Sequence, residues 1–181
     1  MGFIGSNLVR HLVRLGASVT VIDACFPDQG ANLFNLREVL EDLVLVVADI
    51  GSSNEISSYI VDQELVFNLA SCISHIGSLH NPFQDLERNC FSQLRFLSAL
   101  SELSPRARVI YTGSRSQYGN PVYAPIDEDH PLKPLDINGV HKTTVEEYHR
   151  IFHGLGHITF TSLRLTNIFG PHHQMHHDGQ G

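Results

Sequence analysis

Five short runs of apolar, often β-branched residues recur along the chain and predict buried β-strands. They span residues 17–23, 43–49, 64–70, 107–112 and 157–163. Between them, apolar residues repeat with helical spacing over residues 6–15, 31–42, 53–61, 82–103 and 138–152. Near-continuous apolar strands that alternate with helices indicate a parallel sheet covered on both faces. We therefore expect a doubly wound α/β fold.

The start of the chain departs from this alternation. Residues 1–16 predict an amphipathic helix that ends with Gly16 at a C-cap position, and only a glycine-containing loop precedes it. No repeat or linker interrupts the rest, and the proline-rich residues 120–135 predict one long functional loop. With 181 residues, of which 42% are hydrophobic, the chain suits one domain or part of one.

Composition narrows the classes of partner. The formal net charge of −7 provides no basic stripe for a phosphate backbone, which argues against nucleic acid. No apolar run reaches the roughly 18–20 residues that span a bilayer, and no secretory signal pattern opens the chain, so we expect a cytoplasmic protein without a membrane partner. Cys25, Cys72 and Cys90 show no paired spacing and predict buried or half-buried thiols.

A series of short motifs marks the ends of the predicted strands. In chain order they read GFIGSNL, VTVID, VVADI, FNLAS, VIYTGSRSQYG, DINGVHK and SLRLTNIFGP. Their order and spacing resemble the extended short-chain dehydrogenases/reductases of the NAD-dependent nucleotide-sugar epimerase/dehydratase family, such as the UDP-glucose 4-epimerases. The resemblance implies a Rossmann-type fold that binds NAD and a nucleotide sugar.

The resemblance also implies that parts of the family's architecture are missing. Gly2 and Gly5 match only the last two glycines of the dinucleotide fingerprint, so we expect the first strand and the first glycine to be absent. The missing strand is central in the order 3-2-1-4-5-6, and its loss would leave two half-sheets with unpaired inner edges. The family's C-terminal substrate domain is expected to be missing as well, so residues 1–181 form a partial NAD-binding domain.

Several residues match the family's cofactor contacts. Asp23 follows Gly2 by 21 residues, as does the acidic residue that binds the adenosine ribose, and its charge favours NAD over NADP. A turn Asp remains an alternative for Asp23 and Asp49, and a packing role for Ala70. The full predicted set is Gly2, Phe3, Ile4, Gly5, Asp23, Asp49, Ile50, Leu69, Ala70, Ser71 and Lys142.

The predicted substrate contacts follow the last two strands. Aligned on Tyr118 and Gly119, the family's active-site hydroxyl falls at Ser114, where it would hydrogen-bond the sugar oxygen that becomes a carbonyl. A serine that only caps a turn is the alternative. Ser116 would contact the substrate, and Arg115 would bind the sugar or a phosphate, with a solvated side chain as the alternative. Asn167 in the TNIFGP segment would bind the nucleotide-sugar diphosphate.

At one position, this chain lacks the residue type that the family uses as its general base. The family's Y-x-x-x-K helix uses its tyrosine as general base, but here Asn138 occupies that position while Lys142 is retained. An amide has no titratable proton in the useful range, so Asn138 cannot act as the base. His141 shares a helix face with Asn138 and Lys142, so it is a hypothetical substitute for the base. Tyr118 is the other candidate. The alternative for His141 is a polar side chain on the surface without a role in the reaction.

Three functions therefore stay open. The first is an NAD-dependent epimerase or dehydratase that forms a transient keto sugar; the second is a module that binds NAD or a nucleotide sugar without turnover; the third is an incomplete, inactive chain. The long helices 82–103 and 138–152 imply, by resemblance, a homodimer. His172, His173, His176 and His177 lack helix-fixed spacing, so we expect no metal site.

Overall fold

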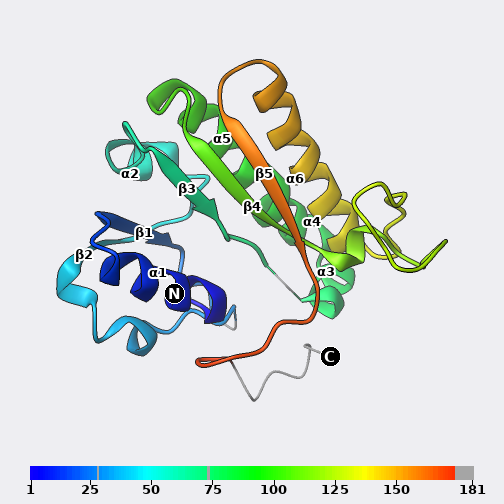
Figure 1. Ribbon diagram of the computed structural model, residues 1–181, viewed down its shortest axis with the longest axis horizontal. Helices are drawn as coiled ribbons and strands as arrows, with labels where there is room; N and C mark the ends of the chain where they lie inside the picture. Colours follow the sequence, from blue (N-terminus) through cyan, green and yellow to red (C-terminus); the bar gives the residue numbers. More distant parts are fainter. Residues whose placement is uncertain (28, 73, 174–181) are drawn as a thin grey trace.

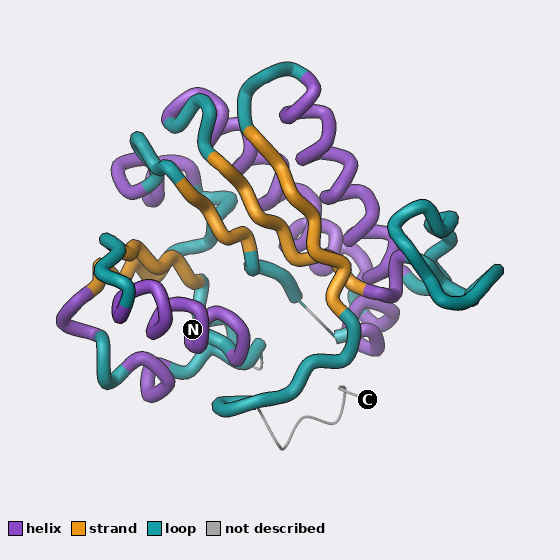
Figure 2. The backbone as a smooth tube through the Cα atoms, viewed as in Figure 1, coloured by secondary structure: helices purple, strands orange, loops and turns teal. Residues whose placement is uncertain are grey.

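The computed structural model describes residues 1–27, 29–72 and 74–173, and these form an α/β fold with parallel strands (Figures 1 and 2). The strands of the described residues are β1 (Val19–Asp23), β2 (Leu43–Val47), β3 (Leu65–Asn68), β4 (Arg108–Ser114) and β5 (Thr159–Leu165). All five predicted strands are therefore confirmed, with shifts of a few residues at their ends.

The strands form two separate sheets. One has the order β1-β2, with Val21 opposite Leu45, and the other has the order β3-β4-β5, with Val66 opposite Val109 and Thr161 opposite Ile110. Every pairing is parallel. The expected split into two half-sheets is thus confirmed, and β1 and β3 present the inner edges to each other (Figure 1).

Helix α1 (Phe3–Arg14) packs on the β1-β2 sheet through an apolar stripe that contacts the cluster around Val21. It begins after Gly2 and ends where Gly16 adopts φ +81°, a left-handed conformation that glycine accepts without a Cβ clash. The predicted C-terminal glycine of this helix is therefore confirmed.

Two long helices cover one face of the other sheet (Figure 1). Helix α5 (Ser92–Leu103) and helix α6 (Ile137–Gly154) pack on each other, and Phe96, Leu97 and Leu100 join Val109 in the main core. Some side chains of β3 and β5 are exposed, with Leu163 44% accessible. The two-sided cover expected from the sequence is therefore only partial in the described residues.

Three predicted helices are broken in the structure. Residues 31–42 form two short 3₁₀ turns, η1 (Leu33–Leu36) and η2 (Leu40–Asp42), because the Asn32 and Asn35 side chains bond to Phe34 N and Met1 O instead of leaving the backbone to an α-helix. Residues 53–61 form α2 (Ser53–Ile56) and η3 (Ser57–Tyr59). Residues 82–103 form α4 (Pro82–Leu86), a π-turn η4 (Glu87–Phe91) and α5.

Two further short helices were not predicted. Helix α3 (His75–His80) begins at a Ser74 cap and ends at Asn81, the cap of α4, and η5 (Arg115–Gln117) follows β4 directly. Both are too short to carry a helical hydrophobic period. Residues 120–135 form the predicted long loop. No helix of the described residues combines the length and the apolar character needed to cross a membrane.

His149 is a buried histidine on α6 that should make the fold sensitive to acid. It stacks between Tyr111 and Phe160, its Nδ1 lies 2.8 Å from Val145 O, and its Nε2 lies 3.2 Å from Asn68 Nδ2. Burial lowers the pKa of His149 to about 4. Below pH ~6.5 the unfolded state therefore binds the proton more readily than the folded state, so stability falls as the pH drops towards 4.

We expect this titration to remove about 3 kcal/mol of the free energy of unfolding between pH ~7 and ~4. Urea unfolding at several pH values measures the loss. His149→Leu should flatten this part of the pH dependence, whereas His11→Leu, on an exposed position of α1, should leave it unchanged. An equal slope in the His149→Leu variant and the unsubstituted chain would contradict the assignment.

Candidate active site

A cavity of about 1720 Å³ runs between the two sheets and along the carboxyl ends of their strands. It begins at the loop before α1, passes the inner edges of β1 and β3, and reaches the residues that follow β4 and β5. In doubly wound sheets, ligands bind at the carboxyl ends of the strands where the chain order reverses. The cavity therefore lies where the fold predicts a ligand.

One end of the cavity is lined by the glycine turn. Gly2, Phe3, Ile4 and Gly5 all line it, at the N-terminal end of α1, where the first backbone amides of a helix point outward. A Cβ added to Gly5 would lie 3.6 Å from the Leu69 side chain, an ordinary contact. The helix start thus offers amide donors and positive dipole to an anionic group in the cavity.

Asp23 and Asp49 also line this end of the cavity. One oxygen of each carboxylate accepts a nearby backbone amide, from Cys25 and Gly51, both at 2.8 Å. The turn role considered for these residues is therefore present alongside their place in the cavity. The second oxygen of Asp23 lies 2.5 Å from the Met1 ammonium group.

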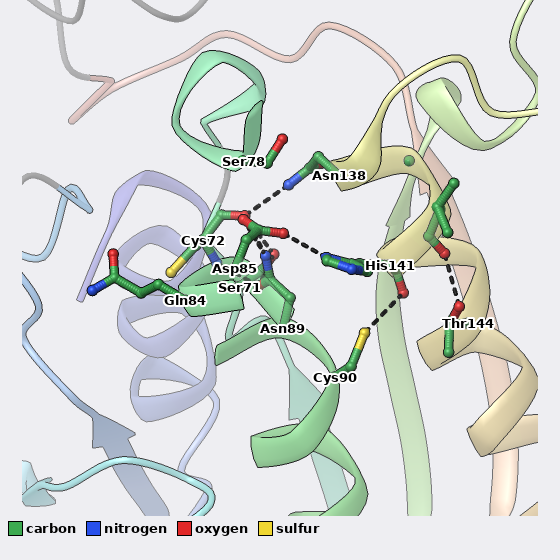
Figure 3. A network of polar contacts seen from close by, with 12 residues as sticks. Ser71, Cys72, Ser78, Gln84, Asp85, Asn89, Cys90, Asn138, His141 and Thr144 are labelled. Carbon is green, nitrogen blue, oxygen red and sulfur yellow. Dashed lines mark hydrogen bonds and ion pairs between the residues drawn. The ribbon is translucent and has the colours of Figure 1, made fainter. Parts of the chain in front are cut away.

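Leu69, Ala70 and Ser71, which follow β3, form part of the cavity wall. Gln93 of α5 donates to Ala70 O at 2.7 Å. Asn89 of the π-turn accepts a hydrogen bond from Cys72 N at 2.8 Å and donates one to Cys72 O at 3.1 Å (Figure 3). The extra residue of the π-turn thus places Asn89 where it holds this wall.

Ser114 and Ser116 line the other end of the cavity, together with the exposed Arg115. Ser114 Oγ accepts Ser116 N at 3.2 Å and the Ser116 hydroxyl at 3.0 Å, which caps η5. Ser114 Oγ is the acceptor in both of these bonds, so its own hydroxyl proton can be donated to a further acceptor. Turn capping and a donor role towards the cavity are therefore compatible.

Asn138 and His141 lie together in a buried polar network beside the cavity (Figure 3). Asn138 Nδ2 donates to Cys72 O at 3.0 Å, and His141 Nδ1 lies 2.6 Å from Asp85 Oδ2. Neither side chain is among those that line the main cavity. Asn138 therefore holds the backbone of Cys72 in place, and His141 is paired with the buried Asp85 carboxylate.

Lys142, the retained lysine, is buried as well. Its Nζ donates to Thr112 O at 3.0 Å and lies 5.3 Å from the centre of the Tyr111 ring. Burial lowers the pKa of Lys142 to about 8 despite the opposing effects of Cys72 and Asp85. Like Asn138, it does not line the main cavity in the described residues.

Comparison with known proteins shows to which family the chain belongs. The chain matches the NAD dependent epimerase/dehydratase family over residues 1–180. The protein belongs to this family. It is 28% identical over 169 residues to a putative UDP-glucose 4-epimerase of Methanocaldococcus jannaschii, a match that covers 93% of this chain and 54% of that protein.

Two solved structures of the epimerase/dehydratase family resemble the chain. A UDP-N-acetylglucosamine 4-epimerase of Methanobrevibacter ruminantium, in complex with UDP-N-acetylmuramic acid, has a TM-score of 0.85 and 27% identity, covering 94% of this chain and 54% of its own. A UDP-glucuronic acid 4-epimerase of Bacillus cereus, with UDP-glucuronic acid and NAD, has a TM-score of 0.85 and 26% identity, covering 96% and 56%. The chain spans about half the length of such relatives.

The segment after β5 closes one side of the cavity in this epimerase-family fold. Asn167 lines the cavity, and the chain then crosses to α1 (Figure 1). There Asn7 donates to Pro171 O at 2.8 Å, and the His173 ring stacks on Phe3 with 4.8 Å between the ring centres. His176 and His177 lie outside the described residues. Within the described part, no group of three metal-ligating side chains comes together.

The motifs in the sequence did not identify a histidine and an aspartate that line the cavity. His75 and Asp136 both line it, and His75 Nδ1 lies 2.8 Å from Asp136 Oδ2. Asp136 carried a usable signal, since an Asp just before a helical stretch predicts an N-cap. His75 lies in α3, which is too short to be recognised by its hydrophobic spacing.

Proposed function

We propose that this chain is the NAD-binding part of an enzyme that epimerises or dehydrates a nucleotide-linked sugar through a transient keto sugar. The observation that carries the proposal is the cavity, which brings the glycine turn, Asp23 and the Ser114 hydroxyl into one space. These groups lie far apart in the sequence, and a packing role alone does not require them to share a cavity.

The residues present fit NAD. The helix start at Gly2–Gly5 would hold the pyrophosphate, Asp23 the adenosine ribose, and Asp49 with Ile50 the adenine, while Ala70 and Ser71 allow close approach of the cofactor to the backbone. When bound, NAD would act as the oxidant that takes a hydride from the sugar and later returns it. The UDP-glucuronic acid 4-epimerase structure with NAD supports this choice of cofactor.

The substrate would occupy the other end of the cavity. Ser114 would donate a hydrogen bond to the sugar oxygen as it becomes a carbonyl, and Ser116 and Arg115 would contact the sugar or a phosphate. Asn167 would bind the diphosphate. The role of Lys142 as a contact to the nicotinamide ribose stays a prediction, because its Nζ is turned to Thr112 O.

The second candidate is a module that binds NAD or a nucleotide sugar without turnover. Asn138 favours it, because this amide cannot serve as a base and instead donates to Cys72 O at 3.0 Å. The two candidates differ in one observable: only the enzyme reduces bound NAD when a nucleotide sugar is added.

Titration of the chain with NAD, followed by UDP-glucose, UDP-galactose and UDP-N-acetylglucosamine, tests the proposal through the absorbance of reduced cofactor at about 340 nm and the epimer ratio of the sugar. Binding without reduced cofactor or epimer would favour the module.

Ser114→Ala should lower kcat about 100-fold, because one donor to the developing oxyanion is lost. Ser101→Ala, on α5 away from the cavity, is the matched control and should change kcat less than about twofold. A Ser114→Ala variant with unchanged kcat would remove Ser114 from the reaction.

A homodimer is part of the same proposal. Large apolar side chains are exposed on α4, η4 and α6, including Phe83 at 83%, Phe91, Val140 and Ile151. Exposed apolar groups gathered on neighbouring helices mark protein contact surfaces. Analytical ultracentrifugation of the unsubstituted chain measures its oligomeric state directly.

A further inference from the structure

A histidine–carboxylate pair lies in the cavity beside the position where the family's tyrosine is replaced. His75 Nδ1 is 2.8 Å from Asp136 Oδ2, and the His75 side chain is 45% accessible. The other Asp136 oxygen accepts Gly139 N at 2.7 Å, so the first turn of α6 fixes this carboxylate in place. With Nδ1 engaged by Asp136, Nε2 is the ring nitrogen that can exchange a proton with a ligand.

The pair is adjacent to the serines at the end of β4. A Cβ placed on Gly139 would lie 3.0 Å from Ser116 O and 3.2 Å from Asp136 Oδ1, so these two groups flank the same point. Ser116 in turn bonds to Ser114 through their hydroxyls at 3.0 Å. The carboxylate that orients His75 thus lies close to the Ser116 backbone, and the side chains of Ser114, Ser116 and His75 belong to residues that line the same cavity.

We propose that His75, oriented by Asp136, is the proton acceptor and donor that replaces the tyrosine. This rests on the proposed function. His75 Nε2 takes the proton of the sugar hydroxyl as the C–O bond of that carbon becomes C=O, and NAD, when bound, would accept the hydride that the carbon loses. His75 then returns the proton to the oxygen, and return of the hydride to the opposite face of the carbonyl would give the epimer and restore both groups.

Other groups near the replaced tyrosine are already engaged by partners within the protein. Asn138 holds Cys72 O, His141 is paired with buried Asp85, and the Tyr118 hydroxyl accepts Arg164 Nη1 at 3.1 Å. None of these three lines the main cavity. His75 does, and Asp136 can stabilise the imidazolium that forms when a proton is accepted.

The test compares His75→Gln with His80→Gln, a matched change on the same helix α3. With NAD and the UDP-sugar that the unsubstituted chain turns over, His75→Gln should lower kcat at least 100-fold with KM changed less than about threefold, and His80→Gln should change kcat less than about twofold. Asp136→Asn keeps an acceptor for Gly139 N and should lower kcat about tenfold or more.

A second readout does not depend on turnover. In chain labelled with ¹⁵N-histidine, the Nε2 signal lost in His75→Gln identifies His75, and addition of UDP-glucose in the presence of NAD should shift that signal while the His80 signal stays in place. If UDP-glucose binds or turns over while the His75 signal is unmoved, or if His75→Gln keeps its kcat, the assignment is overturned and the proposed function stands. If no UDP-sugar binds, the proposed function fails and this assignment fails with it.

Discussion

Replacing Arg164 with alanine is expected to lower the free energy of unfolding by about 3–5 kcal/mol, because it leaves a buried carboxylate without its partner. Arg164 contacts Glu146 through two nitrogens, at 2.5 and 3.1 Å, and Glu146 is 7% accessible. Burial alone would raise the pKa of Glu146, but hydrogen bonds from Arg164, Gln117 and Ser162 outweigh it and lower that pKa. Glu146 therefore stays charged and depends on Arg164.

The matched control is Arg150→Ala. Arg150 pairs with Glu147 on the exposed face of the same helix, and such pairs contribute about 0–1 kcal/mol. Urea unfolding of both variants gives the comparison. The double variant Arg164→Leu/Glu146→Leu should lose less than Arg164→Ala, since no charge is left unpaired. Equal losses in Arg164→Ala and Arg150→Ala would contradict this account.

The same substitution should loosen the loop beside the candidate site. Arg164 also donates to the Tyr118 hydroxyl at 3.1 Å and to Glu128 O at 3.4 Å. These bonds join β5 to the loop of residues 120–135 and to Tyr118 just before it. Limited proteolysis of the Arg164→Ala variant should therefore cut this loop faster than in Arg150→Ala.

Strands were predictable from the sequence because each is a short apolar run. Strands of a parallel sheet bury apolar side chains, so this pattern can be recognised from neighbouring residues alone. The helices at residues 31–42 and 82–103 were less predictable. Their departures from α-helix depend on distant partners, namely Met1 O for Asn35 and the backbone of Cys72 for Asn89. Hydrophobic spacing carries no information about such contacts.

The candidate site likewise has a part that was predictable from the sequence and a part that was not. Gly2, Asp23, Ser114 and Asn167 were predicted from motifs, and the structure places all of them on one cavity. The orientations of the side chains at residues 138–142 were not predictable, because they follow from Cys72 O, Asp85 and Thr112 O across the fold. The His75–Asp136 pair joins residues 61 positions apart and leaves no pattern in the sequence.

A strand supplied in front of Met1 is expected to stabilise the fold by several kcal/mol. The inner edges of β1 and β3 both border the cavity, which is lined there by Val19, Val21 and Val66. A designed segment of about five aliphatic residues, joined by a glycine turn, would pair with both edges and bury its side chains on two faces. Each buried aliphatic side chain contributes about 1.5–3 kcal/mol, against about 1–2 kcal/mol per residue for ordering the added backbone.

Thermal unfolding measures this gain, which should raise Tm by roughly 10 °C or more. The control is a Gly/Ser extension of equal length, which removes the Met1 ammonium from Asp23 without supplying a strand and should not raise Tm. Both extensions free the second oxygen of Asp23, but only the strand also fixes the glycine turn. If the proposed function holds, NAD should therefore bind more tightly to the strand variant than to the control. Equal Tm values for the two extended chains would mean that the space between β1 and β3 does not accept a strand.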